Sequence, residues 1–336
     1  MITNDFSTKE IKFIEMWEEL RRRNCLTDEE IIWFEKIKKE GVIDTLELRK
    51  DKDFQEEVQT IQEFRPIRFH NYRSMYEIGE GANSTVYKAW KIGTNEIVAI
   101  KRLNPLKADD IYKERFLREM KVLTELHHEY ILPILDSGEE DGIDFIVIPF
   151  IAESMEDRMK ELSPHRNLQD IAPFLGIILQ ICKALQYAHE KNIIHRDIKP
   201  GNILLEDEHP YLADFGLARH SREDRNITLG AVGTPCYMAP EVWRKNASPQ
   251  SDIYSIGIIL YELITGHCPF EAKDEEDILF QQLSVVMPPP PITNTMNFPQ
   301  ELNSIIRHAL HQNPSKRYAS IKEFSKELTT VLLNYF

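Results

Sequence analysis

Residues 194–205 read Ile-His-Arg-Asp-Ile-Lys-Pro-Gly-Asn-Ile-Leu-Leu and place three different polar groups between two apolar runs. The runs, at 192–194 and 203–205, have the composition of short buried strands, so the polar residues between them are expected on a rigid loop. There Asp197 can accept the proton of a substrate hydroxyl, Lys199 can neutralise charge on a transferring phosphoryl group, and Asn202 can offer an oxygen to a metal ion. These are the groups that phosphoryl transfer needs, and a plain surface loop is the alternative.

The same stretch resembles the catalytic loop of the protein kinase family, because His-Arg-Asp is followed in register by Lys199 and Asn202. Lysine at position 199 resembles the pattern of the serine/threonine branch of this family. The Pro-Gly-Asn ending and the later Asn313-Pro314-x-x-Arg317 pattern resemble bacterial eukaryotic-like serine/threonine kinases. The resemblance implies an α+β, two-lobed kinase fold with a small antiparallel-sheet N-lobe and a mainly helical C-lobe.

The resemblance continues after the loop with Asp-Phe-Gly at 214–216 and Ala-Pro-Glu at 239–241. It implies that Asp214 joins Asn202 in holding the metal ion. The residues between the two motifs, 217–238, resemble an activation loop, in which Thr228 is the first candidate phosphorylation site and Ser221 the second. The resemblance also implies that Asp252 braces the catalytic loop and that Arg317 pairs with Glu241.

Upstream, residues 78–86 resemble the glycine-rich loop that folds over nucleotide phosphates, with Gly79 and Gly81 in place and Ser84 at the third glycine position. Val-Ala-Ile-Lys at 98–101 reads as a buried strand carrying one ammonium group, which needs anionic partners. The resemblance implies that Lys101 binds phosphates and pairs with Glu119, in a helix expected at 110–126.

Residues 148–151 resemble the hinge between kinase lobes, where backbone groups hold adenine. Ile148 then occupies the gatekeeper position, and Phe150 and Ile151 are expected to supply the backbone contacts, because Pro149 has no N–H. Apolar walls around the base are expected from Ile78, Val86, Ala99 and Leu204. Each of these wall residues is equally compatible with a simple core role. Further strands are expected at 131–135 and 144–148, and a long helix at 171–188.

Composition limits the alternatives. The chain has 336 residues with 41 basic and 55 acidic side chains, a formal charge of −14, which argues against nucleic acid or an anionic membrane as the main partner. Four scattered cysteines form no metal-ligand pattern and suit a reducing compartment. No run of about 18 apolar residues occurs, and charged residues stand where a signal peptide would be hydrophobic, so we expect a cytoplasmic protein without a membrane segment.

Residues 1–67 differ from the rest of the chain, with two capping-box patterns, at 7–10 and 27–30, that predict a short helical extension. This extension either packs on the kinase domain or binds a partner as a regulatory module. The kinase domain is expected at 68–335, with the N-lobe at 70–149 and the C-lobe at 152–335.

The resulting hypothesis is an ATP-dependent serine/threonine protein kinase that uses Mg²⁺, with Mn²⁺ as an alternative, and phosphorylates proteins, including its own activation loop. The alternative is a pseudokinase or scaffold that binds partners through the kinase fold and the N-terminal helices. Kinases that prefer arginine upstream of the target hydroxyl resemble one another in carrying acidic residues just past the hinge and immediately before the catalytic-loop asparagine. In this chain those positions correspond to Met155 and Gly201, so we expect weak selection for arginine. Glu153, Glu156 and Asp157 lie close by, and a shift of one residue in the alignment past the hinge would put a carboxylate back.

Overall fold

The computed structural model of the chain describes residues 67–80, 84–94, 96–104, 110–215, 219–220, 235–244, 246–270, 275–284, 291 and 298–335. Outside these residues lie the helices expected before residue 67, the loop glycine Gly81, and the phosphorylation candidates Ser221 and Thr228. The chain divides into two compact units, one drawn from residues 1–113 and 134–150 and the other from 114–133 and 151–336.

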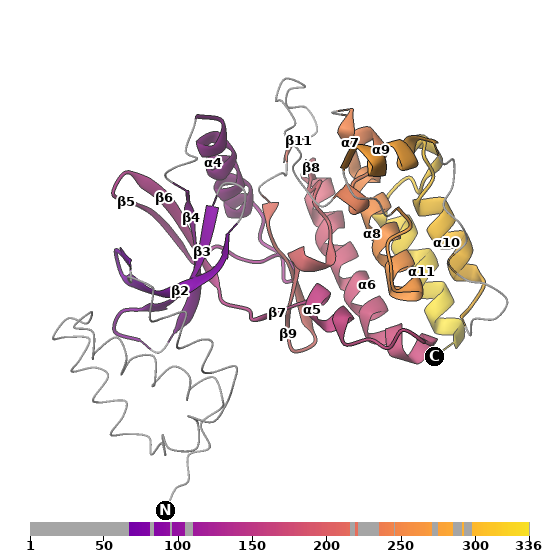
Figure 1. Cartoon of the computed structure of the whole chain (residues 1–336), viewed down its shortest axis with the longest axis horizontal. Coiled ribbons are helices and arrows are strands. Elements are labelled where there is room, and N and C mark those ends of the chain that lie inside the picture. Colours follow the sequence, from indigo (N-terminus) through magenta and orange to yellow (C-terminus); the bar gives the residue numbers. More distant parts are fainter. Residues whose placement is uncertain are drawn as a thin grey trace, which may run out of the picture. The chain divides into compact units, whose positions relative to one another are not determined.

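The first unit contains an antiparallel sheet of six strands in the order β1-β2-β3-β4-β6-β5. The strands are β1 (Arg68–Phe69), β2 (Tyr72–Glu80), β3 (Ser84–Lys91), β4 (Ile97–Leu103), β5 (Asp136–Glu140) and β6 (Ile143–Pro149). Figure 1 shows them as neighbouring arrows. This sheet confirms the antiparallel small lobe that the resemblance implied.

Alternation along β3, β4 and β6 gives this sheet two different faces. Directly opposed residues of antiparallel strands point to the same face. Tyr87, Ile100 and Val147 are such partners, and they belong to a buried apolar cluster that also includes Phe69 and Phe145. The rings of Phe69 and Phe145 meet edge to face with centroids 5.3 Å apart. One face of the sheet is therefore the core of this unit.

The strand predicted at 131–135 is wrong. Only an isolated bridge between Ile131 and Leu212 forms there, and β5 begins at Asp136. Pro133 has no N–H to donate to a ladder. The amide of Leu132 instead donates to Leu212 O at 3.0 Å, and the amide of Leu135 donates to Val147 O at 2.8 Å. An apolar run with an internal proline thus becomes a connection rather than a strand.

The second unit is mainly helical, and α4 runs into it from the first. The helices are α4 (Asp110–Glu125), α5 (Met155–Lys160), α6 (Leu168–Glu190), α7 (Pro240–Trp243), α8 (Pro249–Thr265), α9 (Glu275–Ser284), α10 (Glu301–Ala309) and α11 (Ile321–Tyr335). Short 3₁₀ turns occur at η2 (Pro200–Asn202), η4 (Pro235–Tyr237) and η5 (Pro314–Lys316). Helices α6, α8, α10 and α11 pack on one another, as Figure 1 also shows.

Local sequence signals account for the ends of the two central helices. Asn167 caps α6 and forms a capping box with Asp170, so the helix begins at Leu168, three residues earlier than the apolar pattern predicted. At the start of α8, the backbone amide of Ser248 donates to Ser251 Oγ at 3.0 Å. Gly266 ends α8 with a φ of 85°, a left-handed conformation that costs glycine little.

Helix α6 is long and apolar enough to cross a membrane by length and composition, and no other helix in the described ranges meets this test. Buried residues make up 56% of its most apolar window. They lie in a helix that packs against α8 and α11 inside the second unit. This burial is what a central core helix requires, since an apolar surface of that size needs partners within the fold.

Two small sheets hold the segments around residue 197. β7 (Glu153–Ser154), β9 (Ile203–Glu206) and β10 (His209–Leu212) form one, in the order β10-β9-β7. β8 (Ile193–Ile194) pairs with β11 (Arg219–His220) in the other. β8 and β9 confirm the two buried runs predicted on either side of the polar loop.

Candidate active site

The loop between β8 and β9 is fastened to helix α8 by Asp252. This residue is fully buried, and its carboxylate accepts hydrogen bonds from the backbone amides of His195 at 3.1 Å and Arg196 at 2.9 Å. The ring of His189, on α6, contacts the same carboxylate at 2.8 Å. These bonds hold Arg196 at a φ of 73°, an uncommon value for a residue with a side chain. Asp252 thus braces the loop, as predicted.

Two opposing effects act on the pKa of Asp252. Burial alone would raise it, because a charge is poorly solvated in the interior. The contact with His189, the nearby His195 and the amide of Arg196 outweigh burial and hold the pKa of Asp252 below its usual range. The carboxylate that positions the loop therefore stays ionised at neutral pH.

Asp197, Lys199 and Asn202 converge within this loop. The Asn202 side-chain amide donates to the backbone oxygen of Asp197 at 2.8 Å and to its Oδ2 at 3.0 Å. Lys199 Nζ lies 3.1 Å from the same Oδ2. Because the NH₂ group of Asn202 is used inside the loop, its Oδ1 is the atom that can face a cation. The three residues predicted from the sequence are thereby brought into one cluster.

Asp214 follows β10 and is tied to the same loop through its neighbour. The backbone amide of Ala213 donates to Asn202 O at 2.9 Å, and the ring of His195 contacts Ala213 O at 3.0 Å. Phe215 is fully buried, with its ring 4.5 Å from that of His195 in an edge arrangement. Asp214 itself is exposed and has a φ of 61°. The backbone therefore turns its carboxylate away from the buried side of the segment.

The face of the first unit's sheet opposite its core carries the predicted nucleotide residues. Lys101 lies directly opposite Val86 on β3, and Ala99 lies directly opposite Ile148 on β6. Since Ala99 and Lys101 are two residues apart on β4, all four share one face. Gly79 is the cross-strand neighbour of Val86, and no atom of a described residue lies within 4 Å of the position its Cβ would occupy. This open backbone suits close approach of phosphates.

The remaining predicted residues are distributed between the units. Ile78 is 41% exposed on β2, and Phe150 is half-buried, with Lys88 Nζ 4.5 Å from its ring centroid. Leu204, on β9, and Ile151 are half-buried in the second unit. The side chain of Glu119 is not among those described, so its pairing with Lys101 stays a prediction.

Arg317 and Glu241 form the ion pair that the resemblance implied. Arg317 Nη1 and Nη2 bind the two carboxylate oxygens of Glu241 at 2.6 and 2.9 Å. The guanidinium also lies 4.7 Å from the ring centroid of Tyr254 on α8. This pair joins α7 to the segment that follows α10, and thus fixes the end of the stretch that contains Ala-Pro-Glu.

A pocket of about 480 Å³ opens beside the catalytic loop, inside the second unit. Its lining residues are Glu156, Lys199, Pro200, Gly201, Cys236, Tyr237, Glu262, Gly266, His267 and Cys268. The Glu156 carboxylate lies 2.8 Å from the position that a Cβ on Gly201 would occupy, whereas Met155 is fully buried. Of the three carboxylates that the sequence left open, the structure therefore places Glu156 beside Gly201.

Sequence reasoning missed Tyr237 and Glu262 in this pocket. The Tyr237 hydroxyl donates to Glu262 Oε2 at 2.7 Å, and Ser255 Oγ donates to Tyr237 O at 2.8 Å. Burial and the neighbouring Glu262 raise the pKa of Tyr237, which stays protonated. Their separation of 25 residues follows no short motif. The one sequence signal for Glu262 is that it is a charged residue near the end of the otherwise apolar helix α8.

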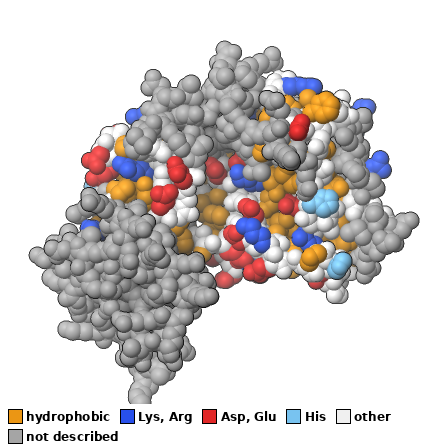
Figure 2. Space-filling view, in the orientation of Figure 1, with side chains coloured by type: hydrophobic (Ala, Val, Ile, Leu, Met, Phe, Trp, Pro, Cys, Tyr) orange, Lys and Arg blue, Asp and Glu red, His pale blue; other side chains and the backbone are white. Residues whose placement is uncertain are grey.

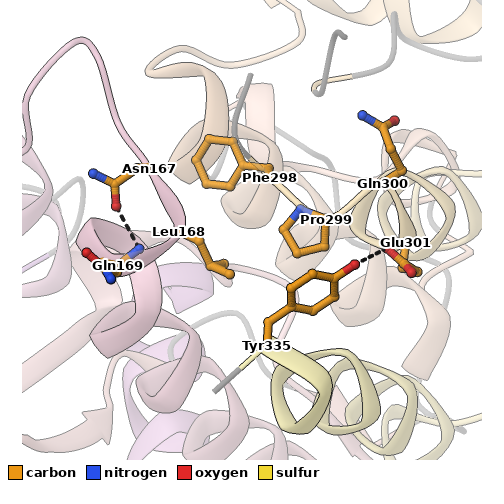
Figure 3. A pocket seen from close by; sticks show the side chains of 8 residues that line it. All are labelled: Asn167, Leu168, Gln169, Phe298, Pro299, Gln300, Glu301 and Tyr335. Carbon is orange, nitrogen blue, oxygen red and sulfur yellow. Dashed lines mark hydrogen bonds between the residues drawn. The ribbon is translucent and has the colours of Figure 1, made fainter. Parts of the chain in front are cut away.

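A second pocket, of about 740 Å³, lies away from the catalytic loop (Figure 3). It is formed where the N-terminal ends of α6 and α10 approach the end of α11, and Tyr335 donates to Glu301 at its rim. None of Asp197, Lys199, Asn202 or Asp214 lines it. The cluster that the sequence predicts for phosphoryl transfer therefore lies outside this larger pocket.

Asn202 and Asp214 are two oxygen-bearing side chains that could hold a cation together with a bound nucleotide. Within the described ranges, no group of three or more His, Cys, Asp or Glu side chains could hold a metal ion. Magnesium in nucleotide sites is usually held by one or two side chains plus phosphate oxygens. Asn202 and Asp214 could provide the side chains. Figure 2 shows basic side chains lying among acidic ones on the described part of this face.

Comparison with known proteins shows in which family this arrangement of residues occurs. The protein kinase domain family matches residues 72–328. A probable serine/threonine-protein kinase of Clostridium acetobutylicum is 32% identical over 272 residues, 79% of this chain and 40% of the relative. Serine/threonine-protein kinase PknK of Mycobacterium tuberculosis is 34% identical over 266 residues, 77% of this chain and 23% of the relative.

A eukaryotic relative shows similar identity: serine/threonine-protein kinase ULK3 of Xenopus laevis is 34% identical over 273 residues, 77% of this chain and 55% of the relative. The chain thus spans less than two thirds of the length of each of these three relatives. The family match covers most of the chain and contains the whole cluster of Asp197, Asn202 and Asp214. The chain therefore belongs to the protein kinase family.

Proposed function

We propose that this chain is a serine/threonine protein kinase that transfers the γ-phosphoryl group of ATP to a protein hydroxyl. The observation that carries the proposal is the convergence of Lys199 and Asn202 on Asp197 in a loop braced by a buried carboxylate. The names of the relatives support the serine/threonine assignment, and Lys199 agrees with it.

Each side chain has a separate role in this proposal. Asn202 and Lys199 contact the Asp197 carboxylate through its Oδ2 atom. Oδ1 is therefore the oxygen that would accept the proton of the substrate hydroxyl. Lys199, beside that carboxylate, would neutralise charge that develops on the transferred group. Asn202 holds Asp197 in place with its amide nitrogen and would present its amide oxygen to the cation.

The family uses ATP and a divalent metal ion, and for this chain we propose Mg²⁺, with Mn²⁺ as an alternative. When bound, ATP supplies the phosphoryl group and the metal ion neutralises its negative charge. Asp214, exposed at the end of β10, would hold the metal with Asn202. Lys101 would bind phosphate oxygens, and Val86, Ala99 and Ile148 on the same face would contact the base.

A radiolabelled-ATP assay tests the proposal. Wild-type protein should label itself or a generic protein substrate, and Asp197→Ala should lose at least about 100-fold in rate, because proton transfer and charge stabilisation typically contribute that much. Asp207→Asn is the matched control, since Asp207 lies exposed in the turn between β9 and β10. Undiminished labelling by Asp197→Ala would refute the mechanism. The pseudokinase alternative is not favoured, and it predicts nucleotide binding without labelling in the wild type.

We further propose that the pocket of about 480 Å³ selects a basic side chain near the phosphoacceptor of the substrate. Glu156 and Glu262 both line it, beside Lys199 and Gly201. This proposal replaces the weak arginine selection expected from Met155. Peptides with and without arginine two or three residues before the serine should differ in kcat/KM, and Glu156→Gln should reduce the difference by about 2- to 5-fold. Glu161→Gln, at the end of α5, serves as the control.

Three further proposals concern regulation and location. Arg196, next to Asp197, supports activation by phosphorylation of the activation loop, with Thr228 first and Ser221 second. We propose that the N-terminal residues 1–67 form an extension that binds either the kinase lobe or a partner. Loss of activity or stability when residues 1–65 are deleted would favour binding to the kinase lobe. A reducing, cytoplasmic location is supported by the free thiols of Cys182, Cys236 and Cys268.

A further inference from the structure

Two cysteines that are 32 positions apart in the sequence share one wall of the pocket beside the catalytic loop. Cys236 lies in η4, and Cys268 lies in the loop that follows α8. Both are half-buried, both line the pocket that contains Lys199, and neither is in a disulfide. The Cys268 thiol interacts with that of Cys236. Two neighbouring, partly exposed thiols have the arrangement from which a disulfide forms.

The contact is fixed by helix α8 on both sides. On one side, Ser255 of α8 donates to the backbone oxygen of Tyr237, next to Cys236, at 2.8 Å. On the other, Thr265 Oγ1 at the end of α8 donates to His267 O at 2.8 Å, next to Cys268. Because both segments are tied to the same rigid helix, the two thiols are held together rather than brought together by chance.

We propose that Cys236 and Cys268 form a reversible intramolecular disulfide when the protein meets a peroxide, and that this bond narrows the pocket beside the catalytic loop. The consequence for catalysis rests on the proposed kinase function. The formation of the bond does not, because it follows from the position of the two thiols alone. Disulfides of this transient kind are the usual form in reducing compartments.

The chemistry is balanced with hydrogen peroxide as the oxidant. The Cys236 thiolate attacks one peroxide oxygen and the O–O bond breaks, so that a sulfenic acid forms and hydroxide leaves; the hydroxide takes up the proton that the Cys236 thiol released and becomes the first water. The Cys268 sulfur then attacks the sulfenic sulfur, the S–S bond forms, and hydroxide leaves with the Cys268 proton as a second water. Two thiols lose two electrons, and one peroxide is reduced to two waters.

The environment of Cys268 indicates the order of these steps. Its contact with Cys236, followed by its burial and the nearby Glu262, raises the pKa of the Cys268 thiol. A thiol that stays protonated is a poor first nucleophile. Cys268 therefore resolves the sulfenic acid, and its contact with Cys236 compensates for its low acidity.

An S–S bond of about 2.05 Å is much shorter than a contact between two thiols. Its formation therefore pulls η4 and the loop after α8 toward each other. Tyr237, adjacent to Cys236, donates to Glu262, so the pocket wall that carries this carboxylate moves with them. We expect a several-fold rise in KM for a peptide substrate, with a smaller change in KM for ATP.

The test treats the full chain with hydrogen peroxide, blocks remaining thiols with N-ethylmaleimide, and identifies linked peptides by mass spectrometry after digestion without reductant. The expected result is a peptide joining Cys236 to Cys268, lost after dithiothreitol, while Cys182 is alkylated only after unfolding because it is buried. Both pocket cysteines alkylated after peroxide, or a disulfide between two chains, would overturn the proposal.

Activity is measured in parallel as the ratio of peptide KM with and without peroxide. Wild type should show a rise that dithiothreitol reverses, and Cys268→Ala and Cys236→Ala should each show a ratio near one. A linked peptide without any kinase activity would support the disulfide and contradict the proposed function. A reversible rise in KM that persists in both alanine variants would contradict the role of this pair.

Discussion

Replacing Arg317 with methionine should lower the free energy of unfolding by about 3–5 kcal/mol, the usual cost of removing one partner from a buried ion pair. The Arg317 side chain is fully buried and the Glu241 carboxylate is 10% exposed. Besides its two bonds to Glu241, Arg317 donates to the backbone oxygens of His311 at 2.7 Å and Gln250 at 2.9 Å. Methionine fills a similar volume and donates to none of them.

The magnitude follows from what the substitution leaves behind. Of its described partners, Glu241 keeps the hydroxyl of Ser251, which donates to its Oε1 at 2.7 Å, while its negative charge stays in the interior. The two backbone oxygens lose a charged donor as well. For a unit of this size, a loss of about 3–5 kcal/mol corresponds to a fall in Tm of about 6–20 °C.

Thermal and urea unfolding, followed by far-ultraviolet circular dichroism, measure this loss. Lys160→Met is the control, because Lys160 forms an exposed ion pair with Asp157 at 3.1 Å and its removal should leave the transition unchanged. The double variant Glu241→Gln with Arg317→Met should be less destabilised than the sum of the two single variants. A transition unchanged in Arg317→Met, or strict additivity, would refute the argument that burial makes this pair costly to break.

Three other predictions follow from the described contacts. In Gly257→Ala, the new Cβ would lie 2.9 Å from both Ala309 Cβ and Leu310 Cδ2, so urea unfolding should show a free energy of unfolding lower by about 1–3 kcal/mol. In Gly176→Ala, no atom of a described residue lies within 4 Å of the new Cβ, so the free energy of unfolding should rise by about 0.5–1 kcal/mol. Equal effects of the two substitutions would contradict this reasoning. The pKa of Asp252 is lowered in the folded protein, so its ionisation adds stability above its ordinary pKa of about 4 and the contribution is lost as the pH falls through and below that value. Stability of Asp252→Asn should therefore depend less steeply on pH in that range, and parallel curves would show that Asp252 is not responsible. Mass spectrometry of active protein should find phosphate between residues 217 and 238, and full activity without it would rule out phospho-activation.

The local elements could be predicted from the sequence because their causes are local. The apolar runs around residue 197 became β8 and β9, and α4 was predicted to within one residue of its end. The resemblance also placed the Arg317 to Glu241 pair and the brace by Asp252. The strand expected at 131–135 failed because Pro133 removes a donor that a strand needs.

Tertiary structure alone decided which residues line the pocket beside the catalytic loop. Ser154 caps α5 with Asp157, and this start of the helix turns Met155 into the core and Glu156 toward Gly201. Cys236 and Cys268 are neighbours because η4 and the loop after α8 are both hydrogen-bonded to α8. Their separation in sequence carries no periodic signal, since such contacts depend on how helices pack and not on the propensity of any one segment. The sequence by itself determined the chemistry of the loop, and packing decided what surrounds it.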